Sequence, residues 1–309
     1  MTHPLTRSNP DRRVRSFGAR LFVGLQYLLP QHALSNAMFW LTRRPWPVLI
    51  HWAIRLYVRI FRVDLSEAAE PDPRAYPSFN AFFTRRLRAD ARPLPSQSNA
   101  IACPVDGRVS RAGRIHNGAL IQAKGRDYSL AALLGGDPSL AALFEDGLFA
   151  TLYLSPRDYH RIHMPIAGRL RQTILVPGRL FSVNPTTAAA VPDLFARNER
   201  AICLFDTRAG PMAVILVGAI FVGSIETVWS ERLTPPRAQA IRVDDAGDEG
   251  PSLSRGDEFG RFNMGSTVIL LFAANSAHWE PQLQPGTAVR CGEQIGQLQR
   301  DRLPAGSKP

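Results

Sequence analysis

The stretch Met212–Ile225, M-A-V-I-L-V-G-A-I-F-V-G-S-I, is apolar over almost all of its 14 residues and indicates the fold class. A membrane-spanning helix needs about 20 apolar residues, so this run, with Gly218 and Gly223 inside it, is too short to cross a bilayer. It predicts one long buried strand or two consecutive strands. A second apolar run, Thr267–Phe272, follows directly after a Gly-Ser pair. Runs of this kind predict a core made of strands.

Working outward, similar short apolar runs recur along the chain and are cut by many of its 23 Gly and 25 Pro. Such punctuation is typical of strands joined by turns. The predicted strands are Gly107–Ile115, Ala119–Ala123, Leu148–Leu154, Arg169–Val176, Ala201–Asp206, Met212–Val222 and Thr267–Phe272. One helix is expected over Leu130–Leu143, another over Ser78–Arg88 with Ser78 as its cap, and residues 234–256 are expected to form a loop. The sequence therefore predicts an α+β fold with a predominantly antiparallel β core.

The net charge of +11 is concentrated at the N-terminus. Residues 1–63 contain ten Arg and a single acidic residue, Asp11, whereas the rest of the chain is nearly neutral. This asymmetry predicts a polyanionic partner, either nucleic acid or an anionic membrane surface. No recognised nucleic-acid-binding motif follows, so the membrane is favoured. The acidic, Pro-rich stretch Asp64–Pro77 reads as a linker, which predicts a basic segment over 1–63 and a second domain over 64–309.

The basic segment is expected to form amphipathic helices rather than a membrane span. Residues 21–42 carry no charge, but Pro30 and several polar residues lie in the middle of them. Two apolar stripes at helical spacing are Phe17, Leu21, Leu25 and Leu28, with Arg12, Arg15 and Gln26 opposite, and Leu49, Ala53, Leu56 and Ile60. Three of the five Trp also fall here. These features predict helices that lie in the headgroup plane; the alternative is that the stripes pack on the body.

Three separate positions could carry chemistry. His160 and His163 lie three residues apart in Tyr153–Pro165, Asp106 lies in the turn Cys103–Arg108, and Ser266 opens a predicted strand after Gly265, which permits an unusual backbone angle. Taken singly, each fits a structural role in a turn or a hydrogen-bonded scaffold. A metal site lacks a third ligand, and the three cysteines form no CxxC pair. Together, however, these residues are the parts of a Ser/His/Asp arrangement.

The same residues lie in longer motifs that extend over nearly the whole chain. These motifs are Leu25–Pro30, Phe79–Arg88, Pro104–Ser110, Gln122–Leu130, Tyr153–Pro165, Pro177–Asn184, Phe195–Arg200, Val222–Trp229 and Gly260–Val268. With them the sequence resembles phosphatidylserine decarboxylase, the pyruvoyl-dependent and membrane-associated bacterial type. The one departure at the Gly-Ser-Thr junction is Met264, where the family often has leucine.

The resemblance implies a two-stage mechanism. In the first stage, His163, oriented by Asp106, takes the proton of Ser266, whose oxygen attacks the carbonyl of Gly265. The chain is then cut between 265 and 266 into a β chain (1–265) and an α chain (266–309) that begins with a pyruvoyl group made from Ser266. In the second stage, this group forms a Schiff base with the serine headgroup and accepts the electrons left by CO2. His160 is the expected proton donor to the product, with His163 as the alternative.

The resemblance also implies the surroundings of the reaction. The substrate is phosphatidylserine in an anionic membrane, the product is phosphatidylethanolamine, and Phe181, Ser182 and Asn184 are expected to contact the headgroup. No metal and no pyridoxal phosphate are expected, and no nucleic acid. The two fragments are expected to stay together as a heterodimer, with further dimerisation left open, on the cytoplasmic face of the inner membrane. The competing hypotheses are a Ser/His/Asp hydrolase of membrane lipids and a non-catalytic membrane adaptor.

Overall fold

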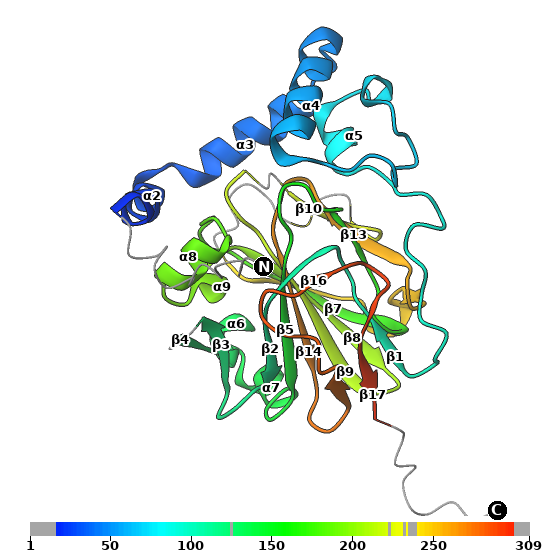
Figure 1. Cartoon of the computed structure of the whole chain (residues 1–309). Coiled ribbons are helices and arrows are strands. Elements are labelled where there is room, and N and C mark those ends of the chain that lie inside the picture. Colours follow the sequence, from blue (N-terminus) through cyan, green and yellow to red (C-terminus); the bar gives the residue numbers. More distant parts are fainter. Residues whose placement is uncertain (1–16, 124–125, 222–223, 231–232, 234–239, 300–309) are drawn as a thin grey trace, which may run out of the picture.

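The computed structural model describes residues 17–299 except 124–125, 222–223, 231–232 and 234–239 (Figure 1). Its N-terminal part consists of the helices α2 (Phe17–Leu28), α3 (Gln31–Thr42) and α4 (Pro47–Phe61). These helices lie along one side of a β-rich body, with α2 near the helices α8 (Pro185–Ala190) and α9 (Leu194–Arg197) (Figure 1). A 3-10 turn, η1 (Pro73–Ala75), and the short helix α5 (Phe79–Phe83) lead from α4 into the body.

The body is built on one large antiparallel sheet. Its strand order is β11 (Arg242–Asp245), β7 (Gly168–Val176), β8 (Arg200–Thr207), β9 (Gly210–Val217), β14 (Thr267–Phe272), β5 (Leu148–Tyr153), β2 (Gly107–Arg114) and β16 (Ala288–Val289), and β12 (Ser252–Leu253) pairs with β7. Strand β14 lies between β9 and β5 and is buried along its whole length. Because both of its edges are paired and both faces are covered, its sequence is apolar without alternation.

Three smaller sheets surround the large one. They are β10 (Ile225–Thr227), β13 (Glu258–Phe262) and β6 (Arg161–His163); β1 (Ala100–Ala102), β17 (Gln294–Leu298) and β15 (Ala277–Trp279); and the pair β3 (Ala119–Ala123) and β4 (Arg126–Ser129). All strand pairs within these sheets are antiparallel. The predicted α+β class with an antiparallel β core is confirmed.

The apolar run from Met212 forms two strands, one of the two expected outcomes, and they lie in different sheets, because β9 ends at Val217 and β10 begins at Ile225. Two other local predictions need correction. The expected helix over Leu130–Leu143 is broken into α6 (Leu130–Leu133) and α7 (Pro138–Ala142) by two glycines with positive φ, Gly135 and Gly136. The expected loop over 234–256 contains β11, β12 and the 3-10 turn η2 (Gly247–Glu249), while 234–239 lie outside the described residues.

Helices α2 and α3 bury polar side chains and expose apolar ones, whereas α4 buries Ile50 and Ile54. Gln26, expected on the outer face of α2, is buried, and its Oε1 accepts a hydrogen bond from the Ser182 backbone N–H at 2.7 Å. Gln31 and Ser35 of α3 are likewise buried and accept backbone N–H bonds from the body. The expected stripe of Phe17, Leu21, Leu25 and Leu28 is exposed. Arg12 and Arg15 lie outside the described residues. None of the described helices is both long and apolar enough to cross a membrane.

Candidate active site

The link between Gly265 and Ser266 lies where the chain passes from the small sheet of β13 into the large sheet. The backbone is held on both sides of it: the Phe262 N–H donates to the His160 carbonyl at 3.0 Å, and the Ser266 carbonyl accepts from the Leu154 N–H at 2.9 Å. Ser266 is completely buried, and its Oγ has no hydrogen-bond partner among the residues that the structure describes. A buried hydroxyl without a partner is uncommon and costs stability, which marks this position as a candidate reactive group.

His160 is the imidazole next to this link. Its ring contacts Phe83 with centroids 4.1 Å apart, and its Nδ1 lies 2.8 Å from the Asp158 carbonyl oxygen. Since a carbonyl can only accept, Nδ1 carries the proton and Nε2 is left with a free lone pair. This Nε2 is buried and has no hydrogen-bond partner in the described part of the chain, and a β-carbon placed on Gly265 would lie 3.5 Å from it. Burial lowers the pKa of His160 to about 3, so the ring is neutral at physiological pH.

Gly265 itself does not have the unusual backbone angle that the sequence suggested. Its φ lies outside the positive range that favours glycine. What its missing side chain provides is space, because a β-carbon there would contact both His160 Nε2 and the Leu154 carbonyl oxygen at 3.5 Å. These are ordinary van der Waals distances, so what they establish is that the Gly265–Ser266 link lies next to the imidazole.

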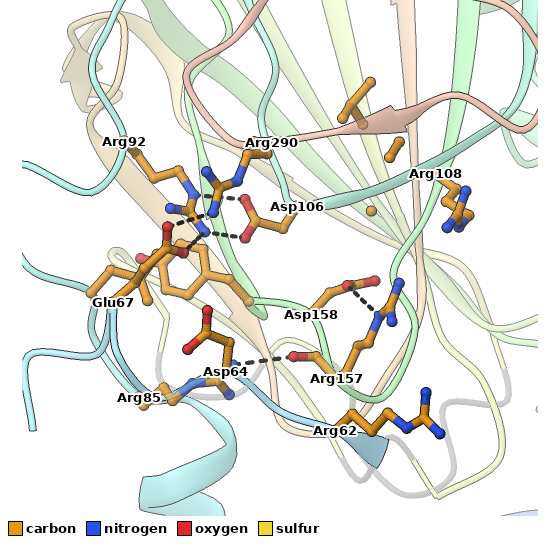
Figure 2. Close-up of a pocket in the computed structure, with 15 residues that line it drawn as sticks. Arg62, Asp64, Glu67, Arg85, Arg92, Asp106, Arg108, Arg157, Asp158 and Arg290 are labelled. Atoms are coloured by element: carbon orange, nitrogen blue, oxygen red, sulfur yellow. Dashed lines mark hydrogen bonds and ion pairs between the residues drawn. The ribbon is translucent and has the colours of Figure 1, made fainter. Parts of the chain in front are cut away.

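Asp106 and His163 have other hydrogen-bond partners than the expected ones. Asp106 accepts a two-pronged bond from Arg92, at 2.9 and 2.5 Å (Figure 2). It accepts a third bond from the Cys291 N–H at 2.8 Å. His163 Nδ1 lies 2.7 Å from the Gly256 carbonyl, and its Nε2 accepts from the Tyr159 hydroxyl at 2.9 Å. Burial lowers the pKa of His163 as well. In the described conformation, the expected Asp106–His163–Ser266 chain of hydrogen bonds is therefore not assembled, and the roles of these residues stay predictions.

A polar network that the sequence analysis missed holds the segment before the link. The Asn263 amide donates to Glu226 Oε1 at 2.7 Å and to Ser224 Oγ. Glu226 also accepts from Arg261 of β13 at 2.7 Å and from Arg43, the residue that ends α3, at 2.9 Å. The N-terminal helices are thereby connected to a residue two positions from Gly265. The only sequence signal was the single acid, Glu226, within the motif Val222–Trp229.

An apolar contact makes the same connection. Met264 packs against a cluster formed by α4 and α5, with Ile50 and Ile54 from the helix and Phe82 and Phe83 from α5. Phe83 also contacts the His160 ring. Displacement of α4 would therefore disturb both the residue before Gly265 and the imidazole beside it.

The three residues expected to contact a headgroup have structural partners. The Phe181 ring is fully buried and lies 4.8 Å from the Tyr27 ring of α2, centroid to centroid. The Ser182 N–H donates to Gln26, and Asn184 caps α8 by accepting from the Thr187 N–H at 2.9 Å. These contacts dock α2 on the body, and headgroup contact stays a prediction.

Comparison with known proteins agrees with the motifs. Residues 79–297 match the family profile described as phosphatidylserine decarboxylase, and residues 21–62 match a profile described as PSD. A protein of Methylococcus capsulatus named phosphatidylserine decarboxylase proenzyme is 53% identical over 277 residues, covering 90% of this chain and 96% of the relative. The relative of the same name from Nitrosococcus oceani is 54% identical and covers 88% of this chain and 90% of its own length. The chain therefore belongs to the phosphatidylserine decarboxylase family.

Proposed function

We propose that this chain, a carboxy-lyase acting on phosphatidylserine, cuts itself between Gly265 and Ser266 and converts Ser266 into a pyruvoyl group. The relatives' name, proenzyme, supports processing of the chain. The observation that carries the proposal is the buried Ser266 hydroxyl, unpartnered in the described structure, on a link whose glycine adjoins the free Nε2 of His160. A buried hydroxyl that no competing hydrogen bond holds is free to turn toward a base for nucleophilic attack.

The cleavage chemistry balances with groups on the chain. Transfer of the Ser266 proton to an imidazole lets Oγ attack the Gly265 carbonyl carbon, and the peptide C–N bond breaks to leave an ester and a free amine. Loss of the Ser266 α-proton then breaks the ester C–O bond, which gives chain 1–265 a carboxylate end. Water then adds at the former α-carbon of Ser266, the nitrogen leaves as ammonia, and a carbonyl remains on that carbon. No external oxidant or cofactor is required.

Two assignments of the base are compatible with the residues. His160 is supported by its position beside Gly265 and by its free Nε2. His163 with Asp106 is supported by the resemblance, and it would require His163 to leave Tyr159 and Asp106 to turn from Arg92. We favour His160 as the first proton acceptor. Two variants separate the assignments. If His160 is the base, His160→Ala stops cleavage and His163→Ala leaves it intact. The reverse result would assign the base to His163 with Asp106.

The site fits a pyruvoyl group formed in place. Ser266 Oγ and Thr267 Oγ1 are both buried and unpartnered among the described residues, so a new carbonyl there displaces no existing hydrogen bond. Once formed, the group would supply an electrophilic carbonyl for the substrate amine and an acceptor for the electron pair left by departing CO2. His160 is the proposed donor of the proton that returns to the α-carbon; because burial lowers its pKa to about 3, the ring is neutral at rest and must first gain a proton when the charged substrate binds.

We further propose that the two fragments stay together after the cut. Strand β14, in the 44-residue fragment after Gly265, is paired along six residues with β9 on one side and with β5 on the other. The strands β15, β16 and β17 of the same fragment pair within it and with β1 and β2. Separating the fragments would expose this buried strand and break both ladders, so a stable heterodimer is expected.

The exposed apolar face of the N-terminal helices supports peripheral attachment to the membrane. Helices α2 and α3 contact the body largely through polar side chains, and α4 through Ile50 and Ile54, which leaves the other apolar side chains of these helices uncovered. Trp40 and Trp46 lie together on this face with centroids 6.0 Å apart, and the Arg44 guanidinium lies 3.9 Å from the Trp40 ring. Aromatic and basic groups beside an apolar stripe are typical of helices at the headgroup level. We propose that residues 1–63 attach the enzyme to the cytoplasmic face of the inner membrane.

The proposed processing is tested by expressing the chain with Ser266→Ala and comparing it with wild type on a denaturing gel. Wild type is expected to give two bands and decarboxylase activity, and Ser266→Ala a single inactive chain. A lipid hydrolase would instead give one intact active chain that reacts with fluorophosphonates. That result would overturn the proposal, and a non-catalytic adaptor would show no activity in either form.

A further inference from the structure

A cavity of about 280 Å³ lies on the other side of the loop that precedes His160. It is lined by α4's last turn, the segment after α5, the turn of Asp106, the loop of Arg157 and the strand β16 (Figure 2). Six arginines contribute to its lining, and they are Arg62, Arg85, Arg92, Arg108, Arg157 and Arg290. Only four acidic residues line it, so the wall carries an excess of two positive charges.

Part of this charge is neutralised within the wall. Arg92 pairs with Asp106 at 2.5 Å and with Glu67 at 2.9 Å, and Arg290 also pairs with Glu67 (Figure 2). Of the two other acids, Asp158 uses Oδ2 to accept from both the N–H and the hydroxyl of Ser155, and its Oδ1 lies 3.8 Å from Arg157 Nε (Figure 2). The excess positive charge therefore resides on the arginines outside the Glu67 network, where Arg157 has only this long ion pair.

Arg85 is the one among them that is buried. Only 5% of the residue is exposed, and its Nε has no hydrogen-bond partner among the described residues. Its Nη2 donates to the Arg157 carbonyl at 3.2 Å, and in the described part of the chain its guanidinium has no carboxylate within ion-pair distance. Burial lowers the pKa of Arg85, which means that its charge is poorly solvated where it lies. A buried guanidinium is costly unless an anion pairs with it, and no such anion comes from the described protein.

The loop between the cavity and the active site is held by three consecutive carbonyls. The Pro156 carbonyl accepts from the Tyr57 hydroxyl of α4 at 2.9 Å, the Arg157 carbonyl from Arg85, and the Asp158 carbonyl from His160 Nδ1 at 2.8 Å. A ligand that draws the Arg85 guanidinium toward itself changes the bond to Arg157, the residue next to the carbonyl that orients His160. The cavity and the imidazole are thus connected through two adjacent peptide units.

We propose that this cavity binds a phosphate group between Arg85 and Arg157, and that its occupation sets the orientation of His160. Phosphate is the anion that suits such a wall, because arginines donate paired N–H groups to its oxygens. The group could come from a lipid phosphodiester or from free phosphate, and the chemistry of recognition is the same. The site is separate from the Gly265–Ser266 link, so it does not depend on the processing proposed above.

Phosphate binding is tested by calorimetry on the purified full chain, with inorganic phosphate and with glycerophosphoserine as probes, at constant ionic strength. The variant is Arg157→Gln, whose side chain is half exposed and whose loss should not affect folding. The matched control is Arg114→Gln, an exposed arginine at the end of β2, outside the cavity. We expect saturable binding to wild type and to the control, and a loss of affinity of about tenfold in Arg157→Gln, the effect of one charge-assisted contact.

The two probes distinguish the source of the phosphate. Tighter binding of glycerophosphoserine supports a lipid headgroup, and tighter binding of inorganic phosphate supports the free ion. Binding of neither, or equal weakening in Arg157→Gln and Arg114→Gln, would overturn the site. The same titration on Ser266→Ala keeps the test independent of self-processing, since binding is expected there too.

The coupling to His160 has its own readout. In a chain with labelled histidine, the His160 ring resonances are expected to shift with phosphate and to saturate at the concentration that the calorimetry gives. The shift should need about tenfold more phosphate in Arg157→Gln. Resonances of His160 that stay fixed while phosphate saturates the cavity would refute the coupling.

Discussion

The exposed side of α4 gives the sharpest test of membrane attachment. Leu49, Trp52 and Ile60 are 53%, 62% and 61% exposed, whereas Ile50 and Ile54 face the body and are buried. Replacing the three exposed residues together by glutamine should therefore leave folding almost unchanged. It should remove most of the apolar surface that this helix offers to a bilayer.

The magnitude follows from the exposed fractions. Full burial of one such side chain stabilises by about 1.5–3 kcal/mol. With a little over half of each side chain available to lipid, the three together contribute about 3–5 kcal/mol to membrane binding. Since about 1.4 kcal/mol corresponds to a factor of ten, binding to vesicles should weaken by about two to four orders of magnitude.

The assay is co-sedimentation of the purified chain with vesicles of phosphatidylglycerol and phosphatidylcholine, at two salt concentrations. The matched control is Ile241→Gln with Val243→Gln, at and beside the edge strand β11, where the two residues are 47% and 51% exposed. The control should bind like wild type. Raising the salt should weaken wild-type binding further, because the arginines of the segment are screened. Undiminished binding of the triple variant, or equal loss in the control, would refute the assignment of this face to the membrane.

Three further predictions concern His160, Glu226 and Gly178. Burial lowers the pKa of His160 from 6.5 to about 3, so the unfolded chain binds more protons than the folded chain between these pH values. The free energy of unfolding should therefore fall as the pH falls through that window. His160→Asn should reduce this fall by on the order of a few kcal/mol, as measured by urea midpoints. Glu226→Gln should slow self-cleavage about tenfold on a time-resolved gel, because it loosens the network that holds the segment before the Gly265–Ser266 link. Its control, Glu249→Gln at an exposed position, should leave the cleavage rate unchanged. Gly178→Ala places a β-carbon 2.4 Å from a backbone carbonyl and should lower the free energy of unfolding by about 1–3 kcal/mol, whereas Gly18→Ala, with open space around it, should be neutral or stabilising in thermal melts.

The sequence was most informative where local pattern and tertiary environment agree. Strand β14 begins and ends at the predicted residues, because a short apolar run after Gly265 and Ser266 has no alternative to a fully buried strand. The helix predicted over Leu130–Leu143 failed for a local reason, since the positive φ of Gly135 and Gly136 ends the first helix within it. The sequence shows that these positions are glycines, but it does not show that their φ angles are positive.

The orientation of the N-terminal helices could not be read from periodicity. The spacing of Leu21 and Leu25 defines a face, but it does not say whether that face meets the body or the surroundings. The outcome depends on Gln26, whose side-chain oxygen accepts a hydrogen bond from the backbone N–H of Ser182. Such a bond joins residues 156 positions apart and leaves no mark in the local sequence.

The roles of the two histidines depend in the same way on distant residues. His160 and His163 are equivalent by residue type and nearly so by position. Their environments differ because Phe83 covers one ring and leaves its Nε2 free, while Tyr159 occupies the Nε2 of the other. The sequence could therefore identify the candidate groups, but it could not show which imidazole lies beside Gly265.

The most direct test of self-processing is the intact mass of the purified, active protein under denaturing conditions. We predict two species, chain 1–265 ending in a glycine carboxylate and a 44-residue fragment whose first residue lacks the amine of Ser266. An active sample that consists of one species of 34.2 kDa would contradict the proposed chemistry.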